Sequence, residues 1–360
     1  MGRAYVLGAA VVVSLGLWLA GLGWTVALLG IAIAIALVSL YPHKVVSVDP
    51  LGKAVFITGC DSGFGNSLAR RLYDRGFLVF AGCLSPDSAG ALALKSECPD
   101  QLHVIQIDVT DEWQVRGALK FVKEKIGDNS LWALVNNAGI AIFTEIEWCS
   151  VSQFQRVLDV NVMGVVRVTK VFLPLLRSAK GRVVNVASLA GRYTFPAFAA
   201  YSMSKRACIA FSDALRIEMK KFGLKVITIE PALYKTPIAE SNLLEQQNRK
   251  SWSETPPEVK DAYGDEYFDA FLKNINVQMK RAIPDTTHVI DLMEEAIIDV
   301  DPRIRYVATT RLGEIRAAIL MLLPTSLTDK LFEKTTPKCL PRQSTGSSVD
   351  SSSDNDVTSR

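Results

Sequence analysis

Between residues 53 and 310, short apolar runs alternate with longer segments of helical character. The runs read KAVFITG, FLVFAG, HVIQID, LWALVNN, GRVVNVAS and KVITIEP, and RYVAT at residues 305–309 is a candidate seventh. Each has the length and the composition of a strand that is buried on both faces. Strands separated by helices in this way form a parallel sheet that helices cover on both sides. The sequence therefore predicts an α/β fold, a Rossmann-type doubly wound parallel sheet in a single catalytic domain.

The first 40 residues differ in composition from the rest of the chain. No charged side chain occurs from Ala4 to Leu40, and about 20 apolar residues are enough to span a bilayer. A cleaved signal peptide is the competing interpretation, but the stretch is about twice the length of a typical apolar signal region. We therefore expect residues 1–45 to form a transmembrane anchor, either as one tilted helix or as a tight pair broken between Gly21 and Trp24.

The predicted catalytic domain covers residues 46–312 and contains one segment that breaks the alternation. From about residue 232 to residue 285 the pattern turns polar and irregular, with aromatic residues among the charges. Insertions of this kind commonly form loops over a substrate. We expect an irregular substrate loop here, and its aromatic residues are Trp252, Tyr263, Tyr267 and Phe268.

Two further segments follow the predicted catalytic domain. Residues 313–342 include IRAAILMLLPTSL at 315–327, which is too short to span a bilayer but could lie against one. Residues 343–360 have almost no apolar content, which is typical of disorder. We therefore expect a membrane-associated segment followed by a disordered tail.

Charge and cysteine content argue against several classes of partner. The chain has 40 basic and 37 acidic side chains, a net charge of +3, and no long block of one sign. This balance gives no electrostatic footprint for nucleic acid. The six cysteines show no CxxC spacing, and the chain has three histidines, so we expect reduced thiols and no metal site.

A glycine-rich turn follows the first predicted strand, in the sequence TGCDSGFGNSLARRL. Gly59, Gly63 and Gly65 stand in the pattern GxxxGxG, between a strand and the start of a helix. Glycines there let the backbone approach a pyrophosphate, whose charge meets the N-terminal N–H groups of the helix. A turn needed only for packing is the alternative for an isolated motif, but a place in the first strand–helix unit favours dinucleotide binding.

Four further polar elements follow the predicted strands or lie near their ends. Asp108 ends the third strand, the segment from Asn136 to Gly139 ends the fourth, Asn161 lies within a helix, and Ser188 follows the fifth strand. Ligands of open parallel sheets bind beyond the carboxyl ends of the strands. Each element alone could be a cap, a turn residue or a satisfied core amide. Their combination is what indicates a site.

The stretch YSMSK at residues 201–205 places Tyr201 four positions before Lys205 on a predicted helix. Residues four apart lie on the same helix face, so the phenol and the ammonium project side by side. A phenol, with an ordinary pKa of about 10, acts as a base near neutral pH only when a cation stands beside it. A solvated Tyr/Lys pair is the alternative for an isolated YxxxK, so the pair counts as chemistry only with the other elements.

Taken in order, TGxxxGxG, NNAG, an internal asparagine, a serine and YxxxK resemble the short-chain dehydrogenase/reductase family over about residues 53–310. The resemblance implies interconversion of an alcohol and a ketone with a nicotinamide dinucleotide and no metal. It gives Tyr201 the function of acid and base, and Lys205 the functions of activating that phenol and holding the nicotinamide ribose. It also implies that Ser188 orients the substrate oxygen and that Asn161 holds a relay water.

The resemblance implies a set of cofactor-binding residues around the glycine turn and the strand ends. They are Thr58, Gly59, Asp61, Ser62, Gly63, Phe64, Gly65, Asp108, Val109, Asn137, Ala138, Gly139, Tyr201, Lys205, Pro231 and Thr236. The second strand ends in FAGCL, which offers no arginine for the 2′-phosphate of NADP. Asp61 in the glycine turn would repel that phosphate. We therefore expect NAD as the cofactor, rather than NADP.

Within the family, the chain looks most like the branch that contains D-β-hydroxybutyrate dehydrogenase, 17-beta-hydroxysteroid dehydrogenase type 2 and the membrane retinol dehydrogenases. The stretches TGCDSGFG, GFLVFAGCL, LVNNAGI, FLPLLRSAKGRVVNVAS and FSDALRIEM carry this likeness. One departure follows the sixth strand, where this branch usually has Pro-Gly and the chain has Pro231-Ala232. Alanine disfavours the positive φ values that glycine adopts easily, so we expect an altered backbone path toward Thr236.

The leading functional hypothesis is a membrane-anchored, NAD-dependent dehydrogenase of a lipophilic secondary alcohol, a steroid or a retinoid. An anchor holds the site where an apolar substrate dissolves. One alternative is D-3-hydroxybutyrate oxidation, in which Arg192 or Lys235 would bind the substrate carboxylate. Another is a catalytically silent dinucleotide-binding sensor or scaffold.

The expected location follows from the N-terminus, which lacks the Arg-rich and Ser-rich character of a mitochondrial transit peptide. We expect the endoplasmic reticulum membrane, with the mitochondrial inner membrane as the alternative. The expected partners are a lipophilic small molecule and membrane lipid, with no nucleic acid, and a homodimer is the candidate assembly.

Overall fold

The computed structural model describes residue 16 and residues 44–333 of the chain. The apolar stretch behind the predicted anchor and the predicted disordered tail at 343–360 therefore lie outside the described residues, apart from residue 16. Within the described ranges, no helix combines the length and the apolar character that crossing a membrane requires. The predicted seven-strand domain lies within these ranges.

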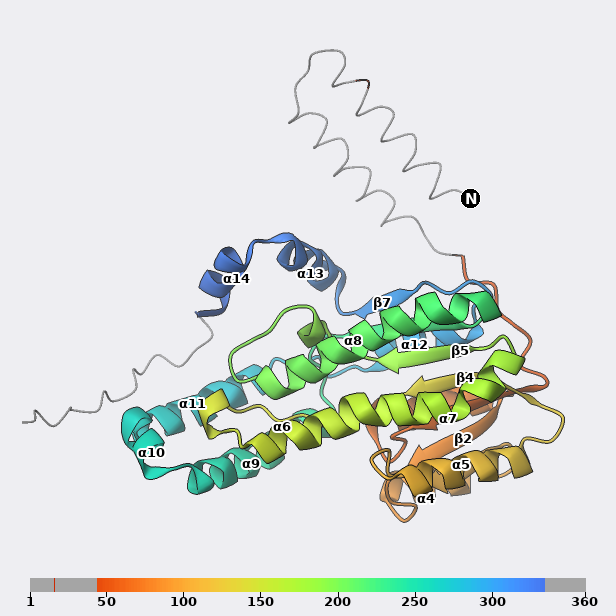
Figure 1. The fold of residues 1–360 in the computed structure, drawn as a ribbon, viewed down its shortest axis with the longest axis horizontal. Coiled ribbons are helices and arrows are strands. Elements are labelled where there is room, and N and C mark those ends of the chain that lie inside the picture. The colour runs from red at the N-terminus through yellow and green to blue at the C-terminus, as the bar shows by residue number, and fades with distance from the viewer. Residues whose placement is uncertain (1–15, 17–43, 334–360) are drawn as a thin grey trace, which may run out of the picture. The chain divides into compact units, whose positions relative to one another are not determined.

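A parallel sheet of seven strands forms the centre of this domain (Figure 1). Its strands are β1 Lys53–Thr58, β2 Leu78–Cys83, β3 Leu102–Gln106, β4 Ser130–Asn136, β5 Arg182–Val186, β6 Lys225–Pro231 and β7 Arg305–Ala308. They follow the order β3-β2-β1-β4-β5-β6-β7, and each neighbouring pair is parallel. The prediction of a Rossmann-type doubly wound parallel sheet, including its seventh strand, is confirmed.

Helices cover the sheet on both faces because its strands are apolar on both faces. In β1, Val55 and Ile57 belong to the buried cluster on one side, and Ala54 and Phe56 belong to the cluster on the other. The helices of the first side are α3 Gly63–Asp74, α4 Ala89–Glu97 and α12 Thr287–Ile298; those of the second are α5 Glu112–Lys125, α7 Val165–Ser178 and α8 Ala199–Met219. Figure 1 shows α5, α7 and α8 side by side across one face of the sheet.

The strand order reverses between β1 and β4, which are neighbours in the sheet although β2 and β3 separate them in sequence. At such a point the chain leaves neighbouring strands in opposite directions, which opens a crevice beyond their carboxyl ends. The glycine turn follows β1 and the NNAG segment overlaps the end of β4. The topology therefore brings these two motifs to the same crevice.

The segment predicted as an irregular loop at about residues 232–285 is largely helical. It contains α9 Ser241–Glu254, α10 Pro257–Tyr263 and α11 Asp265–Met279. The prediction of irregular structure is wrong because the apolar positions of α11 recur with helical spacing and are buried, while charges occupy the positions between them. Those buried positions are Tyr267, Phe268, Phe271, Leu272, Ile275 and Met279.

The aromatic residues of this segment pack on one another and on the loop after β4. The rings of Trp252 and Phe268 are stacked, with centres 4.8 Å apart and planes at 7°. Trp148, in the loop before α6 Val151–Leu158, makes edge contacts with both rings. These side chains therefore form a small hydrophobic core of their own.

Two short helices, α13 Arg311–Leu322 and α14 Thr325–Phe332, end the described part of the chain. Helix α13 buries Ala317 and Leu320 but exposes a series of large apolar side chains at helical spacing. These exposed residues are Leu312, Ile315, Ile319 and Leu322. The helix thus has an apolar surface that the described residues leave exposed.

Candidate active site

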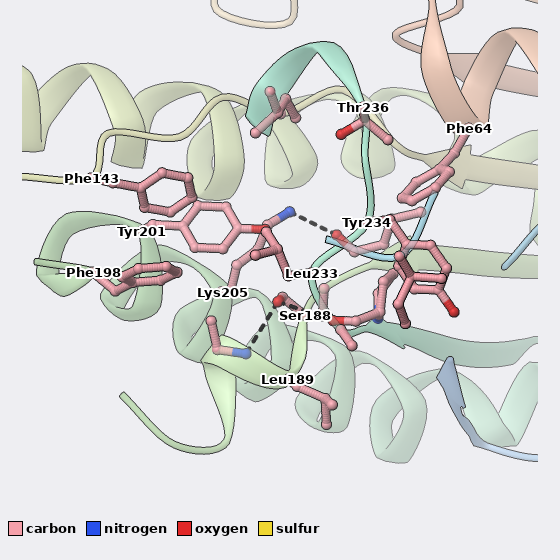
Figure 2. Close-up of a pocket in the computed structure, with 18 of the residues that line it drawn as sticks. Phe64, Phe143, Ser188, Leu189, Phe198, Tyr201, Lys205, Leu233, Tyr234 and Thr236 are labelled. Carbon is pink, nitrogen blue, oxygen red and sulfur yellow. Dashed lines mark hydrogen bonds between the residues drawn. The ribbon is translucent and has the colours of Figure 1, made fainter. Parts of the chain in front are cut away.

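One cavity of about 670 Å³ lies beyond the carboxyl ends of β1, β4, β5 and β6 (Figure 2). Most of the predicted site residues line it: Gly59, Asp61, Ser62, Gly63, Phe64, Asn137, Ala138, Gly139, Ser188, Tyr201, Lys205, Pro231 and Thr236. The predicted residues that do not line it are Thr58, Gly65, Asp108, Val109 and Asn161. Motifs that are far apart in the sequence therefore converge on one cavity.

The glycine turn between β1 and α3 depends on conformations and contacts that other residues disfavour. Gly59 has a φ of +72° and Gly63 a φ of +59°, in the left-handed region that glycine adopts without strain. A Cβ atom on Gly65 would lie 2.5 Å from Asn137 Nδ2 and closer still to the carbonyl oxygen of Gly59. The turn therefore needs its glycines for local geometry as well as for close approach of a ligand.

Helix α3 begins at Gly63 and presents its N-terminus to the cavity. Its first turn contains no acidic residue, and the preceding Ser62 makes no side-chain capping bond. The first backbone N–H groups of the helix are therefore available to an anion, and the helix dipole favours negative charge there. This arrangement fits the pyrophosphate of a dinucleotide.

Asn137 connects the NNAG segment after β4 to the glycine turn after β1. Its Nδ2 donates hydrogen bonds to Thr58 O at 2.9 Å and to Gly59 O at 3.0 Å. The buried hydroxyl of Thr58 accepts hydrogen bonds from the backbone N–H groups of Asn137 and Ala138, both at 3.1 Å. Thr58 thus supports the turn from behind, although it does not line the cavity.

Asp61 lies where the glycine turn approaches the end of β2. Its two carboxylate oxygens accept hydrogen bonds from the N–H groups of Leu84 and Ser85, each at 2.9 Å. The carboxylate is therefore held beyond β2, where a fold of this type receives the adenosine ribose. The nearby ammonium of Lys95 donates to the carbonyl of Pro86 at 2.9 Å.

Asp108 and Val109 follow β3, which ends at Gln106, earlier than predicted. Asp108 Oδ1 accepts hydrogen bonds from the N–H and the hydroxyl of Thr110, at 2.9 and 2.7 Å. Val109 is buried against Gly164, where an added Cβ would lie 2.6 Å from Val109 Cγ2. Both residues shape the loop before α5, and their contacts with a cofactor stay a prediction.

Tyr201 and Lys205 lie one turn apart on α8 and line the same part of the cavity (Figure 2). The ammonium of Lys205 is 5.7 Å from the centre of the Tyr201 ring and donates a hydrogen bond to Val186 O at 2.8 Å. Only 5% of Lys205 is exposed, so water screens its charge weakly. The phenol and the ammonium thus lie together, as the YxxxK spacing predicts.

Two other tyrosines line the cavity, but their phenols lose the proton less readily than an ordinary tyrosine does. Burial raises the pKa of Tyr234 to about 12, and the charges of Asp285 and Glu314 act in the same direction. Burial also raises the pKa of Tyr193. Both phenols are therefore harder to ionise than an ordinary tyrosine, whereas a buried ammonium lies beside Tyr201, the arrangement that suits a phenol to proton transfer.

Ser188 follows β5 and lines the cavity from the start of a 3₁₀ turn, Leu189–Gly191. Its Oγ accepts a hydrogen bond from Ala190 N–H at 3.1 Å and donates one to Pro231 O at 3.2 Å. The bond from the N–H group fixes the oxygen, while the hydroxyl hydrogen can rotate toward another acceptor. Figure 2 shows this hydroxyl on the same side of the cavity as the Tyr201 and Lys205 side chains.

Asn161 lies in a π-helical turn, Asp159–Gly164, between α6 and α7. Its Nδ2 donates to Ile140 O at 2.8 Å and to Ser204 Oγ at 2.9 Å, and its Oδ1 accepts from Ile140 N–H at 2.9 Å. The side-chain amide thus connects the NNAG segment to α8. A contact between Asn161 and a relay water stays a prediction.

Arg192 is engaged by a buried carboxylate. Its Nε and Nη2 donate to the two carboxylate oxygens of Glu230 at 2.9 and 2.5 Å, and Glu230 is fully buried. Lys235 is exposed and does not line the cavity. In the hydroxybutyrate alternative one of these two cations would bind the substrate carboxylate, but Glu230, near the end of β6, binds Arg192, and Lys235 lies outside the lining.

The same ion pair holds the loop that carries Ser188. Arg206, which follows Lys205 on α8, donates from Nε to Gly191 O at 3.1 Å and from Nη2 to Arg192 O at 2.6 Å. The loop is thus tied to β6 through Arg192 and to α8 through Arg206.

Ala232 stands where a glycine was expected after β6, and its effect on the backbone path toward Thr236 stays a prediction. Among the described non-glycine residues, only Lys180 and Ala197 have positive φ values. Ala232 therefore has an ordinary backbone conformation, and its N–H donates to Ala308 O at 2.9 Å. Thr236 still lines the cavity. This position requires no conformation that only glycine adopts.

Sequence reasoning missed an aromatic wall of the cavity, made by Phe143, Tyr193, Phe195 and Phe198. Phe143 packs against Phe198 with ring centres 4.3 Å apart, and it contacts the ring of Tyr201 edge-on at 5.5 Å (Figure 2). These residues lie in loops, where no periodic pattern marks a buried side chain. The aromatic-rich stretch RYTFPAF could have indicated them.

Two arginines that line the cavity were also missed. Arg281 follows α11, and Arg316 lies on α13. Neither stands in a motif, and only the fold brings the two segments to one cavity.

Comparison with known proteins places these features in a wider context. A family model described as short chain dehydrogenase matches residues 53–247. The chain is 43% identical to 17-beta-hydroxysteroid dehydrogenase type 6 of Rattus norvegicus, over 78% of this chain and 87% of that protein. It is 41% identical to retinol dehydrogenase 16 of the same species, over 84% and 94%. It is 40% identical to the mitochondrial D-beta-hydroxybutyrate dehydrogenase of that species, over 78% and 84%.

Solved structures share the fold at lower identity. A short chain dehydrogenase/reductase from Burkholderia phymatum in complex with NAD has a TM-score of 0.62 at 21% identity, covering 82% of this chain and 99% of that chain. One from Burkholderia cenocepacia in complex with NADP has a TM-score of 0.56 at 22% identity, covering 77% and 96%. Both nucleotides thus occur on this fold.

Proposed function

The chain belongs to the short-chain dehydrogenase/reductase family, and on that premise we propose that it interconverts a lipophilic secondary alcohol and its ketone with NAD at a membrane. As a member of this family, it is a nicotinamide-dinucleotide-dependent oxidoreductase that acts on CH–OH groups. The observation that carries the proposal is the meeting of Tyr201, Lys205 and Ser188 in an aromatic-walled cavity beside the glycine turn.

The proposed chemistry is proton transfer by the chain and hydride transfer to the cofactor. When bound, the nicotinamide accepts the hydride of the alcohol carbon. The phenolate of Tyr201 removes the hydroxyl proton, and the Lys205 ammonium stabilises that phenolate at short range. Ser188 turns its hydroxyl hydrogen from Pro231 O toward the substrate oxygen and orients it. In ketone reduction, Tyr201 returns the proton.

The glycine turn and the N-terminus of α3 would hold the pyrophosphate of the cofactor. Tyr201 and Lys205 would hold the nicotinamide ribose. The fixed carboxylate of Asp61 supports NAD, because a 2′-phosphate at this end of the cleft would bring about two more negative charges close to it. Lys95 is a cation near this end of the cleft that would favour NADP if it bound the 2′-phosphate, but its ammonium donates a hydrogen bond to Pro86 O.

The proposed substrate is a steroid or a retinoid. The names of two relatives, a hydroxysteroid dehydrogenase and a retinol dehydrogenase, support this class, and so does the aromatic wall of the cavity. The name of a third relative supports D-3-hydroxybutyrate as the second candidate. For that candidate, Arg192 and Lys235 are not available at the cavity, so Arg281 or Arg316 would have to bind its carboxylate.

The proposed location is the endoplasmic reticulum membrane, with the mitochondrial inner membrane as the alternative. The absence of charge from residue 4 to residue 40 supports an anchor. The exposed apolar side chains of α13, such as Ile315 and Leu322, support a second contact with lipid.

A turnover screen tests this proposal. Membranes that contain the full chain are incubated with secondary-alcohol steroids, retinol or D-3-hydroxybutyrate, each with NAD or with NADP, and the reduced nicotinamide is measured against membranes without the chain. We expect oxidation of a steroid or retinol with NAD. Turnover of D-3-hydroxybutyrate alone would contradict the substrate class, and binding of NAD without any turnover would favour the silent sensor.

A further inference from the structure

We infer that the substrate of this cavity is amphipathic, with an apolar body against the aromatic wall and an oxyanion group that Arg281 and Arg316 bind. This inference rests on the proposed function, because it names the class of alcohol that the site oxidises. The oxyanion is a carboxylate or a sulfate at a distance from the reacting hydroxyl.

The first support is the position and pairing of the two guanidinium groups. Both arginines line the cavity, from segments that are far apart in the sequence. Across residues 44–333, neither guanidinium has a hydrogen bond or an ion-pair partner, whereas Arg116 and Arg249 each bind a carboxylate at the surface. An arginine is a pair of parallel donors that matches a carboxylate or a sulfate.

The second support is the charge of the rest of the lining. Asp61 is the one acidic residue among the described residues that line the cavity, and its oxygens are held by two backbone N–H groups beyond β2. Asp285 and Glu314 lie close enough to raise the pKa of Tyr234, but neither lines the cavity nor reaches an arginine within ion-pair distance. Apart from Asp61, the described lining therefore has no acidic residue to balance the positive charge of the two arginines.

The third support is the apolar surface beside these cations. Phe143, Phe195 and Phe198 line the cavity, and Leu320 lines it from the same helix as Arg316. Apolar walls displace water, and an ion pair gains strength where water is scarce. A neutral lipid would leave the guanidinium groups without a partner next to this surface. An amphipathic anion would pack its apolar body against the aromatic wall and pair its oxyanion with the guanidinium groups.

The test compares matched alcohols that differ in one charge. The full chain, in micelles of a neutral detergent, is assayed with NAD on 12-hydroxystearate and on its methyl ester. A second pair is a steroid with a 17-hydroxyl group and the same steroid with a sulfate at its far end. We expect kcat/KM for the anionic member of at least one pair to exceed that of the neutral member by about tenfold or more. The pair that responds identifies the oxyanion as carboxylate or sulfate.

Variants show whether the two arginines cause this preference. Arg281→Gln and Arg316→Gln should each remove most of the preference for the anion, mainly by raising KM for the anionic alcohol. Lys280→Gln and Arg311→Gln are the matched controls, because each removes one positive charge close by in sequence from a side chain that does not line the cavity. The controls should keep the preference.

Binding of laurate, which has a carboxylate and no hydroxyl, separates this inference from the proposed function. If no alcohol is oxidised but laurate binds and either arginine variant releases it, the proposed function fails and the anion site stands. If alcohols are oxidised without regard to charge, the function stands and the inference is overturned. A loss of NAD affinity in the arginine variants, or an equal loss of preference in the controls, would also overturn it.

Discussion

The cofactor side and the substrate side of the cavity are built in different ways. The cofactor side comes from the turn after β1 and the segment after β4, and it consists mainly of backbone and short side chains. The substrate side comes from the loop after β4, the loop before α8, and α11 and α13, and it consists of large side chains. The first recognises a constant group through backbone geometry, and the second adapts to one substrate through side-chain shape and charge.

Tyr201 lies where the two sides meet, and of the proposed substitutions its replacement should have the largest effect, a loss of turnover. Tyr201→Phe removes only the phenolic oxygen, so we expect turnover to fall by about 10²- to 10⁴-fold with almost unchanged binding of NAD. Binding and single-turnover rate are measured separately. Tyr234→Phe is the control, since that phenol also lines the cavity but burial raises its pKa and keeps it protonated. Half of the wild-type single-turnover rate in Tyr201→Phe would contradict the assignment.

The loop that carries Ser188 on the substrate side depends on the pair between Arg192 and Glu230. Arg192→Leu would leave a fully buried carboxylate without its cation, and we expect the free energy of unfolding to fall by about 3 kcal/mol. Urea unfolding measures this loss. Arg249→Leu, which breaks an exposed pair on α9, should change stability by less than about 1 kcal/mol.

A double variant separates loss of the pair from loss of packing. Replacing both Arg192 and Glu230 by leucine removes the unpaired charge and should recover part of the lost stability. Equal stability of Arg192→Leu and the wild type would show that the loop does not need this pair.

On the cofactor side, adding a single methyl group to the glycine turn should lower both the stability of the chain and its affinity for NAD. Gly65→Ala places a Cβ against the Gly59 carbonyl and Asn137, and we expect a loss of about 2 kcal/mol in the free energy of unfolding together with weaker binding of NAD. Gly117→Ala is the matched control, because an added Cβ there meets nothing within 4 Å. It lies inside α5 and should stabilise the chain by up to about 1 kcal/mol. Similar effects at the two positions would contradict the proposed tight turn.

The sequence located the glycine turn and the NNAG segment on one cavity because the geometry of this side is local. Gly59 and Gly63 adopt positive φ values in a turn that the flanking strand and helix define, so the motif contains most of the information. The strands were predictable for a similar reason, since runs such as KAVFITG must be buried on both faces of a parallel sheet.

The substrate side could not be predicted in the same way because its contacts are distant in the sequence. Arg281 and Arg316 meet one cavity only after α11 and α13 have packed, and no pattern links them. Arg192 was a candidate ligand for a substrate carboxylate only in the hydroxybutyrate alternative, and the sequence does not show that Glu230 binds it. The aromatic residues of α11 were assigned to a loop because interleaved charges obscured their helical spacing.

The choice between NAD and NADP tests whether side-chain charge also acts on the cofactor side. We expect kcat/KM to favour NAD by about tenfold or more, equivalent to about 1.4 kcal/mol, because Asp61 is fixed beyond β2. Asp61→Arg should narrow this preference. Asp87→Arg, the same charge reversal at an exposed position of the loop after β2, should leave it unchanged. A wild-type preference for NADP would contradict the argument and would point to Lys95 as the phosphate ligand.

The smallest effect on stability is expected at Glu145, whose carboxyl group joins two segments of the substrate side that are distant in the sequence. Glu145, in the loop after β4, accepts a hydrogen bond from the hydroxyl of Tyr267 on α11 at 2.7 Å. Burial raises the pKa of Glu145, although the Tyr267 hydroxyl opposes this change. The folded state therefore binds this proton more tightly than the unfolded state. The resulting stability is complete below the ordinary pKa of glutamate and is lost as the pH rises through the raised value.

Glu145→Gln keeps an acceptor for Tyr267 but cannot ionise. Variant and wild type should therefore be equally stable near pH 4, and the variant should be more stable at pH 7 by about 0.5 kcal/mol. Urea unfolding between these pH values measures the difference. Glu266→Gln, at an exposed position beside Tyr267, should show no such pH dependence. If Glu145→Gln is instead less stable than the wild type at pH 7, the hydrogen bond to the ionised carboxylate outweighs the cost of its burial. The substrate side would then hold its distant segments together through charge as well as through apolar packing.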